Sequence, residues 1–496
     1  MRVHLINPPE LAGYISDRDK AGGLGTMFPI NRRYRYRAFT PPLDLMYAAA
    51  VAEREGHEVR LTDACAERLK RTDLLLSLEK EAPDAVGVRL SLPTLKEDLS
   101  IARMLKAVLP RAKVFAFGNV IQTTHARWLD DCGLDGVLFG EPEALVADFL
   151  AGRHNAQVWT PRVPFAPGGW LLQDTAALDA LPHPAWHLLD MRRYSPDGTP
   201  SGATYYVLTS RGCPKACSMC PYYVHQGGPW RARSLESVTA ELDHLKALGA
   251  RFLQARDPNI GLVKKRLRAI AEAMTQGGYG FKWVIETDLE SLDPETLEVL
   301  AKGGLKRLMT GIESADPTIL REIHQHPDAL KLTLKNITRC KELGIELTGF
   351  MVVGSTSESF ESVVATVRMA QHLPMNYSVS LMTPYLGTVY RTEAEELGHV
   401  ADSGNYHELG GTACVVRTRY LDRPKVKLAY RWAQGELEWT LRRRALDEAR
   451  GLGKVLPALR LAKHVVWHAP TSWHFGLERE AARKRANSNQ NLAGVG

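Results

Sequence analysis

Along the first 145 residues, short apolar runs of strand length alternate with stretches that have the period of a helix. Helical periodicity is clearest from Leu43 to Glu55, which ends at Gly56, and from Leu95 to Val108, which ends before Pro110. The predicted strands are Val3 to Asn7, Glu58 to Thr62, Ala85 to Leu90, Lys113 to Phe117 and Gly136 to Phe139. This alternation predicts a flavodoxin-like or Rossmann-like parallel sheet, covered on both faces, over residues 1–150.

Open parallel sheets bind ligands outside the carboxyl ends of their strands. Here the corresponding loops contain Pro8-Pro9, Ser91 to Thr94, Gly118-Asn119 and Gly140-Glu141, and we expect a flat cofactor to rest on that edge. No Gly-x-Gly-x-x-Gly follows the first predicted strand, so a dinucleotide is disfavoured.

Residues 151–200 are rich in proline and turn-forming residues, which predicts a linker. A second alternation follows over residues 201–395, with helical runs such as Leu235 to Leu248 and Ala329 to Leu343. Its predicted strands lie near Tyr205, Phe252, Lys282, Lys306, Glu346 and Tyr377. Six strand–helix units predict a partial (β/α)6 barrel of the TIM type, whose active sites lie at the carboxyl ends of the strands. The fold class is therefore α/β, followed by a mostly helical region over residues 396–496.

The length of the chain indicates that the protein has more than one domain. The 496 residues are 45% apolar and 24% charged, and so long a chain exceeds what one hydrophobic core supports. No uninterrupted apolar run approaches the ~18 residues of a membrane span, and no secretory signal pattern precedes the first strand. We therefore expect a cytoplasmic protein.

The net charge of +7 is concentrated in the last part of the chain. Fifteen Lys and Arg stand against seven Asp and Glu from Leu421 to Gly496. Helical patterns at Leu437 to Ala449 and Val455 to Trp467 combine basic faces with tryptophans. Such faces can contact a membrane surface peripherally or hold an acidic or lipid-like substrate, but more often they are solvated faces of a capping domain. No nucleic acid is expected as a partner, because the region lacks a recognition module.

Three of the seven cysteines, Cys213, Cys217 and Cys220, lie within eight residues. An odd number of cysteines in a chain of this length does not indicate a disulfide framework, so a reducing compartment is implied. Iron–sulfur clusters are commonly held by four thiolates, and a set of three leaves one iron open to a non-protein ligand. A structural zinc site is the alternative, but such sites usually close four ligands from two short elements. The remaining cysteines, Cys65, Cys132, Cys340 and Cys414, stand alone and are expected to be small core residues.

The spacing Cys-x-x-x-Cys-x-x-Cys after the first strand of an alternating barrel resembles the signature of the radical S-adenosylmethionine (SAM) superfamily. The resemblance implies that the three cysteines bind three irons of a 4Fe-4S cluster, and that the amino and carboxylate groups of SAM chelate the fourth. Reduction then breaks the sulfonium bond and gives methionine and a deoxyadenosyl radical. Chelation holds the sulfonium beside the electron donor. An electron-donating partner such as flavodoxin or ferredoxin is also implied.

Further positions resemble SAM-binding segments of this superfamily. Gly311, Glu313 and Ser314, at the end of the fourth predicted strand of the barrel, resemble the Gly-Ile-Glu-Ser segment beside the cofactor. Glu286 on the third strand is a candidate contact to SAM, although a lone carboxylate is more often solvated or salt-bridged.

Two departures from the superfamily pattern are visible. Met219 stands where many members have an aromatic residue before the third cysteine, and Tyr222 is a candidate replacement. Arg256 begins the segment where a Gly-Gly-Glu is common, so binding of the methionine amine there is in doubt.

Residues 1–150 resemble the cobalamin-binding domain of one large subclass of this superfamily. The resemblance rests on Pro8-Pro9, Pro41-Pro42-Leu43, Gly56-His57-Glu58 and Gly140-Glu141-Pro142-Glu143, in matching order and spacing. It implies cobalamin contacts at the loops with Arg89, Ser91, Leu92, Gly118, Gly140 and Glu141. The Asp-x-His-x-x-Gly signature is absent, which implies that no protein histidine lies below the cobalt; Arg89 or Leu92 is expected to face it. The alternative is a domain that only packs or that binds another nucleotide.

These patterns favour methyl transfer to an unactivated carbon of a small-molecule or lipid-like substrate. One SAM methylates cobalamin and another supplies the radical that removes a substrate hydrogen, so both cofactors must face one cavity. A radical cyclisation, ring rearrangement or oxidation with the same cofactors is the alternative enzyme activity. The non-enzymatic alternative is a cobalamin-responsive binding protein with a structural cluster. The pattern assigns no catalytic side chain, and fold and cofactors do not specify the substrate.

Overall fold

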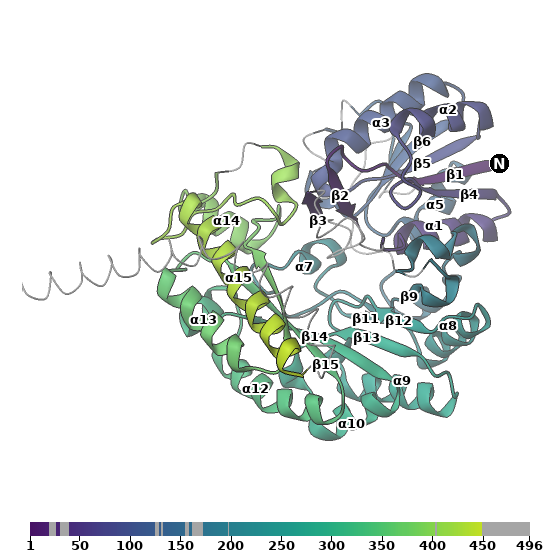
Figure 1. Ribbon diagram of the computed structural model, residues 1–496. Coiled ribbons are helices and arrows are strands. Elements are labelled where there is room, and N and C mark those ends of the chain that lie inside the picture. Colours follow the sequence, from purple (N-terminus) through teal and green to yellow (C-terminus); the bar gives the residue numbers. More distant parts are fainter. Residues whose placement is uncertain are drawn as a thin grey trace, which may run out of the picture.

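The computed structural model describes residues 1–18, 26–29, 39–124, 128–129, 132–153, 158–160, 172–196, 198–401 and 404–448. Two six-stranded sheets form its framework, one in the N-terminal third of the chain and one after residue 203 (Figure 1). Helices pack on the faces of both sheets, which confirms the predicted α/β fold.

The first sheet has the order β4-β1-β5-β6-β7-β8, and its first five strands have the flavodoxin-like arrangement. They run parallel, while β8 is antiparallel to β7. The strands are β1 (Arg2–Asn7), β4 (Glu58–Asp63), β5 (Ala85–Arg89), β6 (Lys113–Phe117), β7 (Gly136–Leu138) and β8 (Val158–Trp159). The apolar pattern predicted the five parallel strands but neither β8 nor the hairpin of β2 (Tyr14–Asp17) and β3 (Thr26–Pro29).

Alternate residues of these strands enter two different cores, because successive side chains point to opposite faces of a sheet. Leu5 packs with α1 (Leu43–Arg54) and α5 (Val146–Ala151), whereas Ile6 packs on the side of α2 (Arg71–Glu81) and α3 (Leu95–Val108). Burial on both faces explains why the central strands β5 and β6 read as continuous apolar runs. The short helix α4 (Ile121–Thr124) follows β6.

The second sheet is an open barrel in which each strand is parallel to the next, in the order β16-β15-β14-β13-β12-β9. The strands are β9 (Thr204–Val207), β12 (Phe252–Ala255), β13 (Lys282–Glu286), β14 (Leu305–Glu313), β15 (Glu346–Val353) and β16 (Asn376–Leu381). The connecting helices are α8 (Leu235–Ala247), α9 (Lys264–Gln276), α10 (Pro294–Lys302), α11 (Pro317–Glu322), α12 (Pro327–Glu342) and α13 (Phe360–His372). The six predicted strand–helix units are thereby confirmed.

Smaller elements complete the functional end of the barrel. A short hairpin, β10 (Ser210–Arg211) with β11 (Arg231–Ala232), encloses α7 (Pro221–Gln226). After the barrel come α14 (Val389–Glu396) and the long α15 (Arg423–Glu448), which packs on α13 and β16. The predicted helix from Val455 to Trp467 lies outside the described residues. None of the helices in the described part is long and apolar enough to cross a bilayer.

The described part of the predicted linker is well packed. It contains α6 (Thr175–Asp179), and the Trp186 ring centroid lies 4.9 Å from that of Tyr205 on β9. The hydroxyl of buried Tyr194 donates a 2.7 Å hydrogen bond to Asp63 at the end of β4. This segment therefore contacts both sheets, while the boundaries at residues 150, 200 and 395 stay predictions.

Candidate active site

All three clustered cysteines lie between the two strands of the β10–β11 hairpin, at the carboxyl end of the barrel. Ala216 has a φ of 47°, so the chain turns sharply between the first two cysteines. The amide of Cys220 donates to the carbonyl of Cys217 at 3.0 Å, and Cys220 itself precedes Pro221 at the start of α7. The loop thus gathers three half-buried thiols beside a single helix start.

The thiols of this loop have raised pKa values and remain protonated until a metal ion binds them. Burial raises the pKa of Cys217 to about 11 and that of Cys220 to about 12, and in both cases charge on the other cysteines adds to the effect. Iron binds thiolates, so bound metal must provide the stabilisation that the protein lacks. Within the described ranges, no three His, Cys, Asp or Glu side chains have the spacing of a site for one metal ion.

Three carboxylates lie next to the cysteine loop, at the ends of neighbouring strands. Glu286 ends β13, Asp288 follows it, and Glu313 ends β14. Burial, together with Glu286 and Asp288, raises the pKa of Glu313 to about 8, and its Oε2 accepts no hydrogen bond from the described residues. A buried carboxyl group with one unbonded oxygen, beside two other carboxylates, fits a cationic ligand with N–H donors. In SAM the sulfonium would supply the positive charge and the amino group the N–H donors.

Gly311 and Ser314, the other two residues expected to contact SAM at the end of β14, have different roles in the structure. A Cβ on Gly311 would lie 2.6 Å from Oε1 of Glu313, so glycine leaves room for that carboxylate. The Ser314 hydroxyl lies 3.2 Å from that of Thr366 and accepts a hydrogen bond from the Asp316 amide, so it orients the start of α11. Ser314 does not line the large cavity described next.

The barrel encloses a cavity of about 2430 Å³ that opens to solvent. One end is bordered by Cys220, Glu286 and Glu313. Its wall is formed by alternate residues of the strands, such as Met309, Thr348, Phe350, Val352, Ser378 and Ser380. Across the open side of the barrel, α15 contributes Tyr430, Gln434, Leu437, Glu438 and Leu441.

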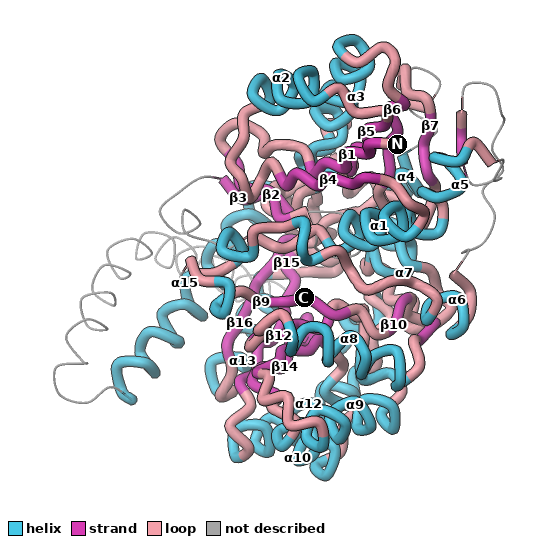
Figure 2. Tube along the Cα trace, turned by 90° about the vertical axis from the view of Figure 1, so that its right-hand side faces the viewer, coloured by secondary structure: helices cyan, strands magenta, loops and turns pink. Residues whose placement is uncertain are grey.

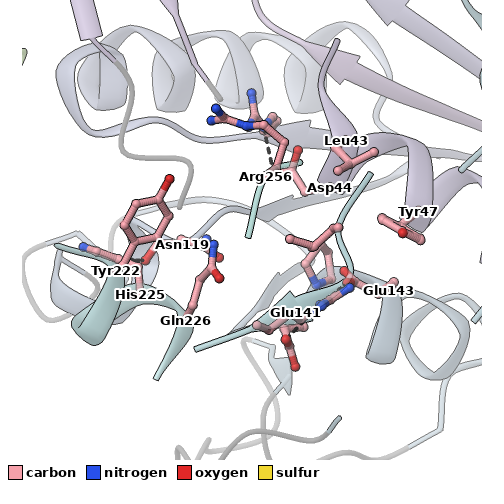
Figure 3. Close-up of a pocket in the computed structure, with 14 residues that line it drawn as sticks. Leu43, Asp44, Tyr47, Asn119, Glu141, Glu143, Tyr222, His225, Gln226 and Arg256 are labelled. Atoms are coloured by element: carbon pink, nitrogen blue, oxygen red, sulfur yellow. Dashed lines mark hydrogen bonds and ion pairs between the residues drawn. The ribbon is translucent and has the colours of Figure 1, made fainter. Parts of the chain in front are cut away.

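A second cavity, of about 630 Å³, lies where the two halves of the chain meet (Figure 3). Its walls come from α1, the end of β5, the loops after β6 and β7, and α7. Figure 2 shows α1 and α7 between the two sheets. The labelled lining residues are Leu43, Asp44, Tyr47, Asn119, Glu141, Glu143, Tyr222, His225, Gln226 and Arg256. This is the sheet edge at which the sequence predicts a flat cofactor.

His225 on α7 is held in one protonation state. Its Nδ1 lies 2.7 Å from the carbonyl oxygen of Asn119, which can only accept, so Nδ1 carries the proton. Burial lowers the pKa of His225 to about 4. The ring is therefore neutral and ties the cysteine-bearing segment to the loop after β6.

Four of the six residues expected to contact cobalamin fall into two groups, and the other two are glycines. Arg89 and Glu141 line the second cavity, and Nε of Arg89 donates a 2.8 Å hydrogen bond to Asp44. Ser91 and Leu92 are both buried. The backbone amide of Ser91 donates a hydrogen bond to Asp98, and Leu92 packs in an apolar core. Neither is among the residues that line the cavity.

Two glycines beside this cavity are required by the conformation of the backbone. Gly118 has a φ of 140°, and a Cβ there would lie 2.4 Å from the carbonyl oxygen of Leu90. Gly140 has a φ of 98°, a conformation that L side chains rarely adopt. Both therefore shape the loops from which Asn119 and Glu141 reach the cavity.

Tyr222 and Arg256 line both cavities. The guanidinium carbon of Arg256 lies 5.4 Å from the ring centroid of Tyr206 on β9. Sequence reasoning placed both residues near the site only as departures from a pattern. Asp257, beside Arg256, is a structural residue that accepts hydrogen bonds from Thr209 and Ser210.

Two family models match this chain. The radical SAM superfamily model matches residues 207–370, and the B12 binding domain model matches residues 35–150. The chain is 30% identical over 367 residues to an uncharacterized methyltransferase of Pyrococcus horikoshii, covering 70% of this chain and 77% of that protein. This chain belongs to the radical SAM superfamily. The two matched regions contain the cysteine loop and most of the first sheet, so it is a cobalamin-dependent member, as predicted.

Other relatives of this radical SAM enzyme are also methyltransferases. It is 27% identical to cytidylyl-2-hydroxyethylphosphonate methyltransferase of Streptomyces wedmorensis, over 73% of this chain and 79% of the relative. It is 28% identical to hopanoid C-3 methylase of Methylococcus capsulatus, over 72% and 69%. Among solved structures, the radical SAM methyltransferase TsrM of Kitasatospora setae superposes with a TM-score of 0.64 at 17% identity, over 93% of this chain and 99% of the other. That likeness concerns the fold.

The predicted cofactors of this radical SAM enzyme are confirmed at the level of the family: a 4Fe-4S cluster, SAM and cobalamin. When bound, the cluster and SAM supply radical chemistry, and cobalamin supplies a methyl carrier. The chain contributes three thiols for the cluster, the buried carboxyl group of Glu313 for a cationic ligand and, at the edge of the first sheet, a cavity lined by Arg89 and Asn119 that could receive part of a corrinoid.

Proposed function

We propose that this radical SAM methyltransferase methylates an unactivated carbon of a small, largely apolar molecule bound in the barrel cavity. The observation that carries this proposal is that the barrel cavity and the interdomain cavity share Tyr222 and Arg256. A carbon held near Cys220 therefore lies beside both cofactor regions, as transfer from one to the other requires.

The lining of the barrel cavity supports an elongated substrate. Along α15, Tyr430, Gln434, Leu437 and Leu441 line the cavity at helical spacing, which corresponds to a wall about 16 Å long. Opposite them lie apolar side chains such as Met309 on β14 and Phe350 on β15. Polar side chains such as Thr348, Ser378 and Ser380 share these walls with the apolar ones. The lining therefore suits a ligand with an apolar body and several polar substituents, and a lipid-like molecule with polar groups meets this description.

The same proposal assigns the cofactor contacts. Cys213, Cys217 and Cys220 bind the cluster, and Glu313 with Glu286 receives the amino group of SAM beside it. Gly311 makes space for Glu313. On the cobalamin side, the cavity residue Arg89 is proposed as a contact, because it is buried and lies at the carboxyl end of β5. Leu92, Ser91, Gly118 and Gly140 act by shaping the loops.

The test is anaerobic reconstitution of the full chain with iron, sulfide and cobalamin, followed by mass spectrometry of candidate apolar metabolites. We expect a product heavier by one CH₂, together with 5′-deoxyadenosine and S-adenosylhomocysteine. Cys217→Ala should abolish the cluster absorbance and both nucleoside products, whereas Cys340→Ala, a buried cysteine on α12, should retain them. A product with unchanged carbon count would contradict methylation and indicate a cyclase or oxidase.

The remaining partners follow from the same proposal. Reduction of the cluster needs an electron donor such as flavodoxin or ferredoxin, and free thiols and an exposed iron site suit the cytoplasm. A peripheral membrane contact through the basic region after Leu421 would serve a lipid-like substrate. Liposome co-sedimentation that is unaffected by deletion of the residues after Leu421 would count against it.

A further inference from the structure

The β10–β11 hairpin that closes the base of the cysteine loop places two arginines directly opposite each other. Arg211 on β10 pairs in register with Arg231 on β11, and Cys213 follows Arg211 by two residues. Both arginines are buried, with 7% and 4% of their surface exposed. Like charges directly opposite on neighbouring strands are destabilising, and burial increases the cost. The hairpin therefore needs a counter-charge.

That counter-charge comes from the cobalamin-binding half of the chain. Oε1 of Glu141 lies 2.8 Å from Nη1 of Arg211, and both Glu141 oxygens accept bonds from Nη1 of Arg231 at 3.0 and 2.9 Å. Glu143 forms a second ion pair with Arg211. The two glutamates belong to the loop after β7, about seventy residues earlier in the sequence.

Arg231 also bonds to the end of the cysteine loop, besides donating from Nη1 to the carbonyl of Leu172 at 2.8 Å. Its Nη2 donates to the carbonyl of Gln226, the last residue of α7, at 2.7 Å. The amide of Cys213 donates to the carbonyl of Gly227 at 3.1 Å. The bridge from Glu141 through Arg231 thus reaches the helix that begins at the third cysteine. Glu141, Glu143 and Arg211 also line the interdomain cavity.

We propose that Glu141 and Glu143 are positioning residues for the iron–sulfur cluster: by neutralising Arg211 and Arg231, the cobalamin-binding half holds the cysteine loop in place. Occupancy of the interdomain cavity then affects the cluster through the same ion pairs. This role replaces the direct cobalamin contact that the sequence suggested for Glu141. The proposal depends on the two cofactors and is independent of which carbon is methylated.

The test compares Glu141→Gln with a matched control in the full-length, reconstituted enzyme. The control is Glu241→Gln, which removes the carboxylate partner of buried Arg233, an ion pair that lies entirely within the barrel half. The readouts are the rate of iron loss to a chelator and the EPR spectrum of the reduced cluster, each with and without hydroxocobalamin.

In the wild type we expect hydroxocobalamin to slow iron loss and to alter the EPR spectrum. Glu141→Gln should lose iron about tenfold faster, because it removes the carboxylate that both buried arginines share, and should no longer respond to hydroxocobalamin. Glu241→Gln should keep the response. Wild-type iron loss and a wild-type response in folded Glu141→Gln would overturn the proposal.

A second variant separates positioning from general destabilisation. Adding Arg231→Met to Glu141→Gln removes the like-charge pair, so iron retention should return toward the wild-type rate; a double variant as fast as the single one would overturn the proposal. If Glu141→Gln does not accumulate as folded protein, the comparison is made with Glu143→Gln, which leaves Arg231 paired with Glu141. The product assay is separate, so loss of methylation alone leaves this inference standing.

Discussion

Glu313 adopts a backbone conformation that glutamate rarely occupies. Its φ of 55° lies in the left-handed region, which costs a side-chain-bearing residue about 1–2 kcal/mol. The register of β14 and β15 shifts between Gly311 and Glu313, so the strand ends with an irregular turn. Strain of this kind persists at sites where a group must be held in place. Here it places a carboxylate at the cysteine end of the barrel cavity.

The raised pKa of Glu313 predicts the pH dependence of SAM binding. Below a pH of about 8 the carboxyl group keeps its proton, and losing it adds a negative charge and makes both oxygens acceptors for the cationic ligand. Affinity should therefore rise with pH up to about 8, by at most about tenfold per unit, and then level off. Calorimetric titration of the reconstituted enzyme at several pH values measures this. Glu313→Gln should bind more weakly and lose that part of the slope; an unchanged slope would refute the assignment.

At the scale of single residues, the sequence predicts a metal site where the metal ligands are close together in the chain. The three cysteines share one loop, so their spacing alone groups them. The partners of Glu141 could not be found in this way, because Arg211 and Arg231 are seventy and ninety residues away. The left-handed turn at Glu313 gives no compositional signal either, because glutamate is not a residue that marks such turns.

At the scale of elements, the loops after β5 and β6 depend on one close backbone approach. Gly118 allows its chain to pass the Leu90 carbonyl at a distance that no Cβ could tolerate. The loop after β6 carries Asn119 and borders the interdomain cavity, so its geometry shapes that wall of the cavity.

Gly118→Ala should destabilise the protein by more than about 2 kcal/mol, because it adds a backbone clash to conformational strain. Gly56→Ala is the matched control: Gly56 also has a positive φ, of 81°, but open space surrounds its missing side chain. It should cost about 1 kcal/mol, from strain alone. Urea unfolding and cobalamin affinity measure both effects. Equal losses of stability in the two variants would contradict the clash.

The sequence predicted strands accurately where burial gives the apolar residues a recognisable spacing. Central strands of the first sheet, such as β5 and β6, are buried on both faces and form apolar runs, whereas β4 and the barrel strand β15 alternate buried with more exposed residues. The elements that were missed, β2, β3, β8, β10 and β11, have two to four residues each. Such short strands contain too few positions for a two-residue period to stand out.

At the scale of the whole molecule, the two halves share one apolar core. Leu5 of the first sheet and Leu253 of the barrel belong to the same continuous cluster of buried residues. Trp186, from the segment between the sheets, is 2% exposed and joins this cluster. A second cluster connects the first sheet to residues after the barrel, such as Leu386 and Leu409.

A shared core predicts that the two halves unfold together. Trp186→Ala should lower the free energy of unfolding by about 3–5 kcal/mol, because it leaves a large cavity between the halves. His187→Ala is the control: its side chain is 62% exposed and meets Glu53 in a surface ion pair, worth at most about 1 kcal/mol. Denaturant unfolding followed by circular dichroism measures both. Two separate transitions, or an unaffected Trp186→Ala, would contradict this coupling.

The facing arginines of the cysteine-loop hairpin also bear on how such enzymes diversify. A barrel that carries this hairpin cannot be recombined freely with any corrinoid module, because each exchange must bring two carboxylates to the same point. Much else in a grafted module can vary. Lineages that swap modules should therefore inherit the acidic loop and the arginine pair together or lose both.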